Sequence, residues 1–272
     1  MRLATALILC GLASACGSEP QSPPAAAETT FQQWSLPVQL REISGLAMTR
    51  DQRLLAVADE EAIVYEVDYE AGRLIKSYAL GRPVVREDFE GIAVLGDRVW
   101  LMTSDGDLYS APEGENGEQV SFERIETDIG RECELEGLAS ISEPPSLALL
   151  CKDGRKRKKL RIHRWEPGNG IVSEIELPEK AMEEAIGAKR IRPSGLEIDP
   201  VTGDWIVVAA AQRAVFRVGA DGEFRGVIMR LNGDRHRQAE GIAITADGRL
   251  LIADEGGRGS ARLAVYPAYD KE

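Results

Sequence analysis

Three glutamates occupy the same place in a phrase that recurs along this 272-residue sequence. Each stands directly before a glycine, which is followed by isoleucine or leucine and then by alanine; they are Glu90, Glu136 and Glu240. Two further copies carry a serine there, Ser44 and Ser194. Carboxylates that converge in a confined space repel one another unless they are protonated, hydrated or bridged by a cation. Oxygen ligands suit a hard cation, and the flexible shell of calcium suits such a set better than the strict octahedron of magnesium.

The five copies are evenly spaced, which indicates a repeat architecture. Successive glycines lie 46, 46, 58 and 46 residues apart, at Gly45, Gly91, Gly137, Gly195 and Gly241. Each copy begins an apolar segment that is followed by a turn and a second apolar segment. Repeats of roughly 40 to 50 residues built from short strands are typical of a β-propeller, in which each repeat is a four-stranded blade. The sequence therefore predicts an all-β, five-bladed propeller, with six blades as the alternative if one repeat is hidden.

The two ends of the repeat region are expected to meet in one blade. Residues 31–40 have a strand-like composition but precede the first copy, and the fifth copy stops soon after its third strand, residues 261–267. An N-terminal strand that completes the last blade would close the ring without an open edge. Residues 179–189 carry apolar side chains near a helical period and account for the longer spacing of 58 residues.

The first strand of each propeller blade lines the central channel, so the residues before the five glycines should meet at one level of its axis. We predict that Glu90, Glu136 and Glu240 bind Ca²⁺ there, beside Ser44 and Ser194. Other polar residues are expected on the same rim; they are Asp59, Asp105, Asp254, Arg192 and Arg213. In the alternative interpretation, the glutamates accept hydrogen bonds from the next blade and have only a structural role.

The N-terminus is typical of an export signal. Arg2 precedes an apolar run, residues 3–12, that is too short to span a bilayer, and small residues precede Cys16. Residues 1–15 resemble a bacterial lipoprotein signal, which implies that Cys16 becomes lipidated; a secretory signal cleaved near Ala15 is the alternative. Residues 16–30 are expected to form a flexible tether, and residues 31–272 the propeller. Gly17 favours, by the same resemblance, an outer-membrane location facing the periplasm.

Charge and cysteine content restrict the environment further. The formal net charge of -12 argues against nucleic-acid binding, which rests on a basic surface. Cys133 and Cys151 flank a predicted hairpin whose turn is residues 143–146, so they should lie on adjacent strands. Because export compartments are oxidising, we predict a disulfide within the third blade. Two buried free thiols are the alternative.

The phrases at residues 88–93 and 238–243, the latter followed by residues 252–255, resemble the SdiA-regulated (YjiK-like) family. The resemblance covers residues 34–266 and implies a β-propeller, a cell-envelope location and bound calcium, but no defined activity. The serines at positions 44 and 194 depart from a fully acidic ring.

Two functions follow as alternatives. The first is a monomeric, non-enzymatic envelope lipoprotein that binds a small ligand or an envelope protein at the acidic rim. The second is a calcium-dependent phosphoesterase or esterase, in which Asp105 or Asp254 activates water. The first is favoured because the sequence places no clustered histidines or repeated lysines near the channel mouth.

Overall fold

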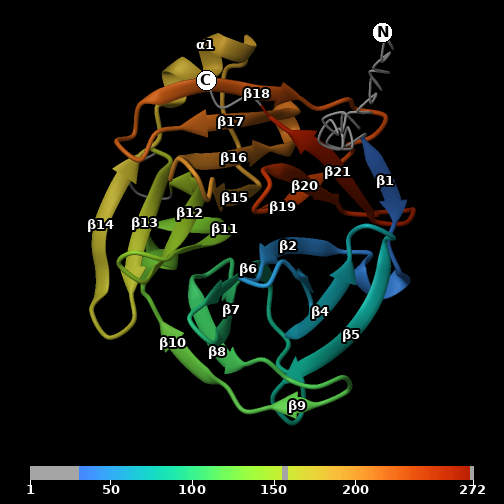
Figure 1. Cartoon of the computed structure of the whole chain (residues 1–272). Helices are drawn as coiled ribbons and strands as arrows, with labels where there is room; N and C mark the ends of the chain where they lie inside the picture. The colour runs from blue at the N-terminus through green and yellow to red at the C-terminus, as the bar shows by residue number, and fades with distance from the viewer. Residues whose placement is uncertain (1–30, 155–158, 270–272) are drawn as a thin grey trace, which may run out of the picture.

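Five small sheets stand around a central axis in the computed structural model, which describes residues 31–154 and 159–269 (Figure 1). The innermost strands are β2 (Ile43–Met48), β6 (Phe89–Leu95), β11 (Cys133–Ile141), β15 (Gly195–Ile198) and β19 (Ala239–Ile244). The second strands are β3 (Leu54–Ala58), β7 (Arg98–Thr103), β12 (Ser146–Gly154), β16 (Trp205–Ala209) and β20 (Arg249–Asp254). The five-bladed propeller predicted from the glycine spacing is thereby confirmed.

The outer half of each blade follows the same antiparallel order. The third strands are β4 (Ile63–Asp68), β8 (Asp107–Pro112), β13 (Arg161–Glu166), β17 (Ala214–Val218) and β21 (Arg262–Ala268). The outermost strands are β5 (Arg73–Leu80), β10 (Glu123–Glu126), β14 (Gly170–Glu176), β18 (Phe224–Arg230) and β1 (Gln32–Ser35). Strand β1 pairs with β21, so the N-terminal strand closes the ring as predicted. It is shorter than residues 31–40, because a 3-10 turn over Val38–Leu40 follows Pro37.

One short outer strand joins the sheet of the neighbouring blade. Val120 belongs to β9 (Gln119–Val120), which follows β8 of blade two but pairs in parallel with β5 of blade one. Burial of Val120 in the apolar cluster that contains Tyr78 draws this segment to the neighbouring blade. The edge of blade two is formed by β10 instead.

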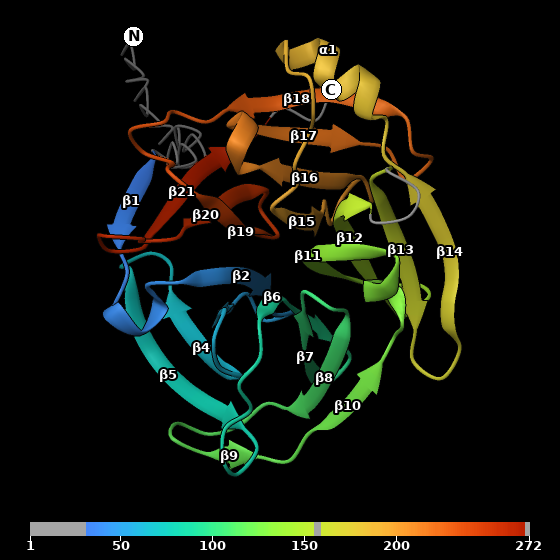
Figure 2. The same ribbon diagram turned by 180° about the vertical axis from the view of Figure 1, so that it is seen from behind.

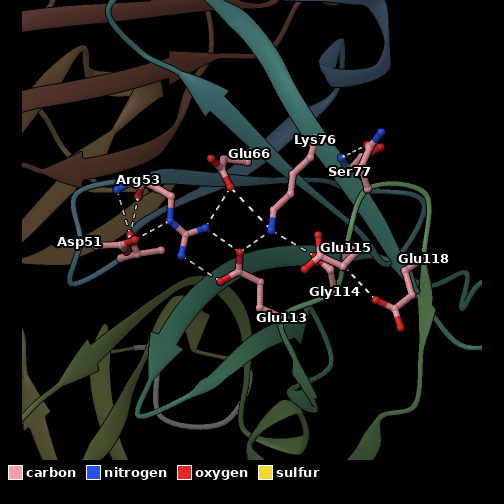
Figure 3. Close-up of polar contacts among 11 residues, drawn as sticks. Asp51, Arg53, Glu66, Lys76, Ser77, Glu113, Gly114, Glu115 and Glu118 are labelled. Atoms are coloured by element: carbon pink, nitrogen blue, oxygen red, sulfur yellow. Dashed lines mark hydrogen bonds and ion pairs between the residues drawn. The ribbon is translucent and has the colours of Figure 1, made fainter.

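A cluster of charged residues connects the segment between β8 and β9 to blade one (Figure 3). The Glu113 carboxylate accepts hydrogen bonds from Arg53 at 2.6 and 3.0 Å and from Lys76 Nζ at 2.6 Å. Arg53 also donates to Glu66 Oε2 at 2.9 Å and to Asp51 Oδ2 at 2.8 Å. The contacts therefore join blades one and two outside the channel.

The helix expected between blades three and four is α1 (Glu179–Ile186), which lies outside β18 (Figure 2). Met182 is buried in the core between these blades, and Ile186 packs against the same core. The helix ends where Gly187 adopts a left-handed conformation with φ of 68°, which residues other than glycine rarely adopt. Within the described parts of the chain, no helix is long and apolar enough to cross a membrane.

Neighbouring blades come into close contact at the five repeated glycines. A Cβ atom on Gly91 would lie 2.7 Å from the Leu138 Cβ, and one on Gly195 would lie 2.3 Å from the Glu240 carbonyl oxygen. The residue after each glycine is a buried leucine or isoleucine that packs between blades; these residues are Leu46, Ile92, Leu138, Leu196 and Ile242. The repeated phrase thus places a small residue at the contact and a large one in the adjoining core.

A disulfide joins Cys133 on β11 to Cys151 on β12, as predicted for blade three, with their Cα atoms 5.6 Å apart. The two residues are not directly opposite each other. Cys133 is paired with Gly154 and Cys151 with Leu135, because the register shifts beside these residues.

Candidate functional site

A β-bulge stands directly before four of the five repeated glycines. The register shifts across it in β2, β6, β11 and β19, and the residues that it leaves without a pairing partner are Ser44, Glu90, Glu136 and Glu240. Bulges commonly redirect a side chain next to a functional site. In blade four the inner strand begins only at Gly195, directly after Ser194.

The bulged residues come together around one small cavity of about 10 Å³ on the channel axis. Its polar lining consists of the side chains of Glu90, Glu136, Glu240 and Ser44, which come from four different blades. Ser44 is only 3% exposed, and its Oγ has no hydrogen-bond partner among the described residues. The cavity is therefore lined by a buried hydroxyl that forms no hydrogen bond within the described part of the chain.

Ser194, the other serine of the repeat, has a different environment. Its Oγ donates a hydrogen bond to the Ala239 carbonyl oxygen at 2.7 Å and accepts one from the Ala210 N–H at 3.0 Å. It thus connects blade four to blade five, and it is not among the residues that line the cavity. Ser194 therefore has a structural role between blades, but as a donor to the next blade and not as the acceptor considered for the glutamates.

Lys152 is the important residue that inspection of the repeats did not identify. It lies on β12 next to Cys151, where a second register shift leaves it without a pairing partner on β11. It forms an ion pair with Glu136, and its Nζ lies 3.6 Å from Glu134. A regular hairpin register does not indicate this pair, because β11 and β12 shift register on both sides of Leu135. One ammonium therefore faces the three carboxylates of the cavity.

Burial and mutual repulsion shift the ionisation of this cluster. Burial, followed by the nearby Glu136 charge, raises the pKa of Glu90 to about 9, and burial raises the pKa of Glu240 to about 7. Burial also raises the pKa of Glu136, against the opposing effect of Lys152. Burial by itself lowers the pKa of Lys152, but its acidic neighbours outweigh that effect and raise it. The carboxyls thus favour protonation unless further positive charge reaches the cavity.

The donor set fits a hard divalent cation. Every polar group that lines the cavity offers oxygen, and three carboxylates against one ammonium leave two negative charges when all are ionised. The three glutamates are not drawn into a compact cluster, however. Among the described residues, the group of His, Cys, Asp and Glu with ligand atoms all within 4.8 Å of one another is Cys133, Cys151 and His163, which contains the disulfide. A cation would have to draw the glutamates together or bind them partly through water.

The rim aspartates lie near the starts of the inner strands, at the predicted end of the channel. The Asp59 N–H donates to the Glu42 carbonyl oxygen at 3.0 Å, and the Ser104 N–H, directly before Asp105, donates to that of Asp88 at 2.9 Å. Asp105 is exposed. Asp59 has one buried carboxylate oxygen without a hydrogen-bond partner in the described chain. Burial, followed by its acidic neighbours, raises the pKa of Asp59 to about 6.

Asp254 lies below the rim, in a buried network. Its two oxygens accept hydrogen bonds from the Gln238 N–H at 3.2 Å and pair with His236 Nδ1 at 2.6 Å. His236 Nε2 lies 2.6 Å from the Tyr266 hydroxyl, so the network holds β20 and β21 to the segment before β19. Arg192 and Arg213, on the blade-four side, are exposed and do not line the cavity.

The pKa values of the cavity predict how stability depends on pH. In calcium-free protein, the free energy of unfolding should fall as pH rises from about 4.5 to about 9. The pKa of Glu90 is about 9 in the fold against an ordinary value of 4.5, so the folded protein binds more protons than the unfolded chain throughout this window. Urea denaturation at several pH values measures the slope. Glu90→Gln should reduce the dependence of the free energy of unfolding on pH. An equally steep slope in that variant would show that Glu90 is not its source.

The fold is shared with solved structures of several enzymes. A glutaminyl cyclase from Myxococcus xanthus aligns with a TM-score of 0.58 and 14% identity, over 88% of this chain and 96% of its own. A luciferin-regenerating enzyme aligns with a TM-score of 0.57 and 10% identity, over 88% and 95%. A PQQ-bound aldose sugar dehydrogenase from Streptomyces coelicolor gives 0.52 and 14%, over 90% and 99%. At such low identity these matches show the propeller fold alone.

Family membership follows from the sequence of the blades themselves. Residues 27–258 match the SdiA-regulated family, and this range includes all five repeated glycines together with Ser44, Glu90, Glu136 and Glu240. The match agrees with the resemblance carried by the phrases at residues 88–93 and 238–243. This chain is a member of the SdiA-regulated family.

Proposed function

We propose that the protein is an exported, lipid-anchored binding propeller whose acidic channel mouth holds calcium and presents it to a ligand or partner. The observation that carries the proposal is the meeting of three glutamates with Ser44, whose buried hydroxyl has no partner among the described residues. Glu90, Glu136 and Glu240 would hold the ion. Bound calcium would supply the positive charge that allows these carboxylates to ionise in a buried place.

The surroundings of the cavity suit recognition of a ligand at this face. Asp59 lines a neighbouring hollow of about 190 Å³ together with Glu42, Glu60 and Glu61. The rim thus combines an acidic surface with the proposed metal at its centre. Hydrolysis receives less support, because Asp254, one of the two aspartates considered as the base, already pairs with His236 and the Gln238 N–H.

The proposed location rests on the sequence of the N-terminus. The export signal, the tether and Cys16 all fall within residues 1–30, which lie outside the described residues. Lipidation of Cys16 would place the domain on the outer membrane, facing the periplasm. Cys16→Ala should move the protein from the membrane fraction to the soluble fraction of the cell, and membrane retention of this variant would contradict the anchor.

Calcium binding is tested by calorimetric titration of chelator-treated protein that begins at residue 18. We expect calcium to bind more tightly than magnesium, and Glu90→Gln to weaken calcium binding by about tenfold or more, because one ionised ligand is lost. Glu115→Gln removes an exposed carboxylate from the segment near β9 and should leave calcium affinity unchanged. Equal calcium affinity in Glu90→Gln and the unaltered protein would refute the site.

A further inference from the structure

A second, larger hollow of about 500 Å³ lies at the other end of the channel. Its inner wall is formed by the later residues of the inner strands, including Ala93, Val94 and Ile244. Ile92 and Leu138 line both this hollow and the small acidic cavity, so apolar side chains separate the two spaces. The far hollow is therefore a site of its own.

Glu197 is the exception to the repeat in this hollow. The second residue after the repeated glycine is alanine in four blades, Ala47, Ala93, Ala139 and Ala243, and glutamate in blade four. Each of these alanines shares an apolar cluster with the leucine or isoleucine that follows the glycine of the next blade, as Ala139 does with Leu196. By the same pattern, the neighbour of Glu197 is Ile242. A carboxylate thus occupies an apolar position between blades four and five.

Few hydrogen bonds or charges offset the loss of water around the Glu197 carboxylate. Among the described residues, the hydrogen bond recorded for it comes from the adjacent Ile198 N–H to Oε1 at 2.8 Å. Burial raises the pKa of Glu197 to about 8, and in the part of the chain that the structure describes no neighbouring cation acts against that shift. The side chain is nevertheless only half-buried, because it borders the hollow. A ligand in the hollow can therefore reach it.

The remaining charges favour a cation in the hollow over an anion. Arg50 and Glu143 lie exposed at its edge and carry opposite charges. Asp199 also lines it and accepts hydrogen bonds from the N–H groups of Val201 and Thr202. Along the inner strands, the wall of the hollow is apolar except for Glu197 and Ser140. A pocket with an apolar inner wall and the carboxylates of Glu197 and Asp199 suits a small ligand with an apolar body and one positively charged group.

We propose that the hollow at the far end of the channel binds a small organic cation, a primary amine on an apolar body, with Glu197 as its counter-ion. The ammonium would donate hydrogen bonds to the Glu197 carboxylate, and the apolar body would contact side chains such as Val94, Ile198 and Ile244. The acidic mouth is not required, because the apolar residues of the channel separate the two sites. This inference goes beyond the proposed calcium site and does not depend on it.

The test compares benzylammonium with benzyl alcohol, its neutral counterpart, by calorimetric titration of the propeller at pH 8.5. Benzylammonium should bind at concentrations up to about 10 mM, and benzyl alcohol at least about tenfold more weakly. Glu197→Ala restores the residue found in the other four blades, so it should fold, and it should weaken benzylammonium binding by about tenfold or more. Glu143→Gln, which removes an exposed charge at the edge, should change that affinity by less than about twofold.

Three results would overturn the proposal. They are an absence of benzylammonium binding, equal binding of benzyl alcohol, and unchanged benzylammonium affinity in Glu197→Ala. An equal loss in Glu143→Gln and Glu197→Ala would also count against it, because general acidity rather than a specific counter-ion would then explain binding. A thermal unfolding curve of Glu197→Ala verifies that the variant is folded before binding is compared.

Discussion

Gly195→Ala is expected to lower the free energy of unfolding by about 3 kcal/mol or more. The new Cβ would lie 2.3 Å from the Glu240 carbonyl oxygen, a backbone atom that cannot move away by rotation of a side chain. Blade four would have to move away from blade five, which loosens the core around Ile242 and Ile244. Urea denaturation followed by far-ultraviolet circular dichroism measures the change.

Gly259→Ala is the matched control for this effect. Gly259 is exposed, its φ lies outside the range that disfavours other residues, and a Cβ there would lie 3.5 Å from the Gly256 carbonyl oxygen, an ordinary contact distance. This variant should stay within about 0.5 kcal/mol of the unaltered protein. Equal stability of both variants would show that the blades do not need a glycine where they meet.

Lys152→Met is expected to destabilise the calcium-free protein by about 2 kcal/mol at pH 8. Glu136 is 4% exposed, and the substitution would leave its carboxylate buried beside Glu90 without the ammonium. Because Lys152 is one-third exposed, the effect should be smaller than for a fully buried pair. The loss should shrink as pH falls and Glu136 takes up a proton. Chemical denaturation at pH 8 and pH 5 measures both values.

Two companion experiments separate charge from packing at Lys152. In Lys152→Met combined with Glu136→Gln, most of the lost stability should return, because no unpaired charge remains. Calcium should raise the free energy of unfolding more in Lys152→Met than in the unaltered protein, since the ammonium no longer competes for Glu136. If the double variant were as unstable as Lys152→Met, packing rather than charge would be responsible.

The architecture could be predicted because it is encoded in local repeats. The glycine spacing determined the number of blades, and the unpaired segments at both ends predicted ring closure through β1 and β21. Cys133 and Cys151 could be paired because both belong to one hairpin, where sequence distance from the turn predicts proximity. Each of these inferences depends on neighbours within a blade or on the period of the chain.

The features that escaped prediction depend on contacts between blades or on strand irregularities. Ser44 and Ser194 are equivalent in the repeat, yet the Ser194 hydroxyl bonds to Ala239 of the next blade whereas Ser44 faces the cavity. The pairing of Lys152 with Glu136 depends on a bulge that a regular hairpin register does not include. Strand β9 pairs with β5 of blade one because Val120 is buried in an apolar cluster there. Periodicity alone carries no information about such contacts.

Anomalous diffraction from a crystal of the protein grown with calcium tests directly whether the three glutamates bind the ion. We expect an anomalous peak at the channel mouth, between the carboxylates of Glu90, Glu136 and Glu240 and near the Ser44 hydroxyl. The peak should be absent in Glu90→Gln crystals grown under the same conditions. A cavity without a peak at millimolar calcium, with Lys152 still paired to Glu136, would contradict calcium binding at this site and make these glutamates structural.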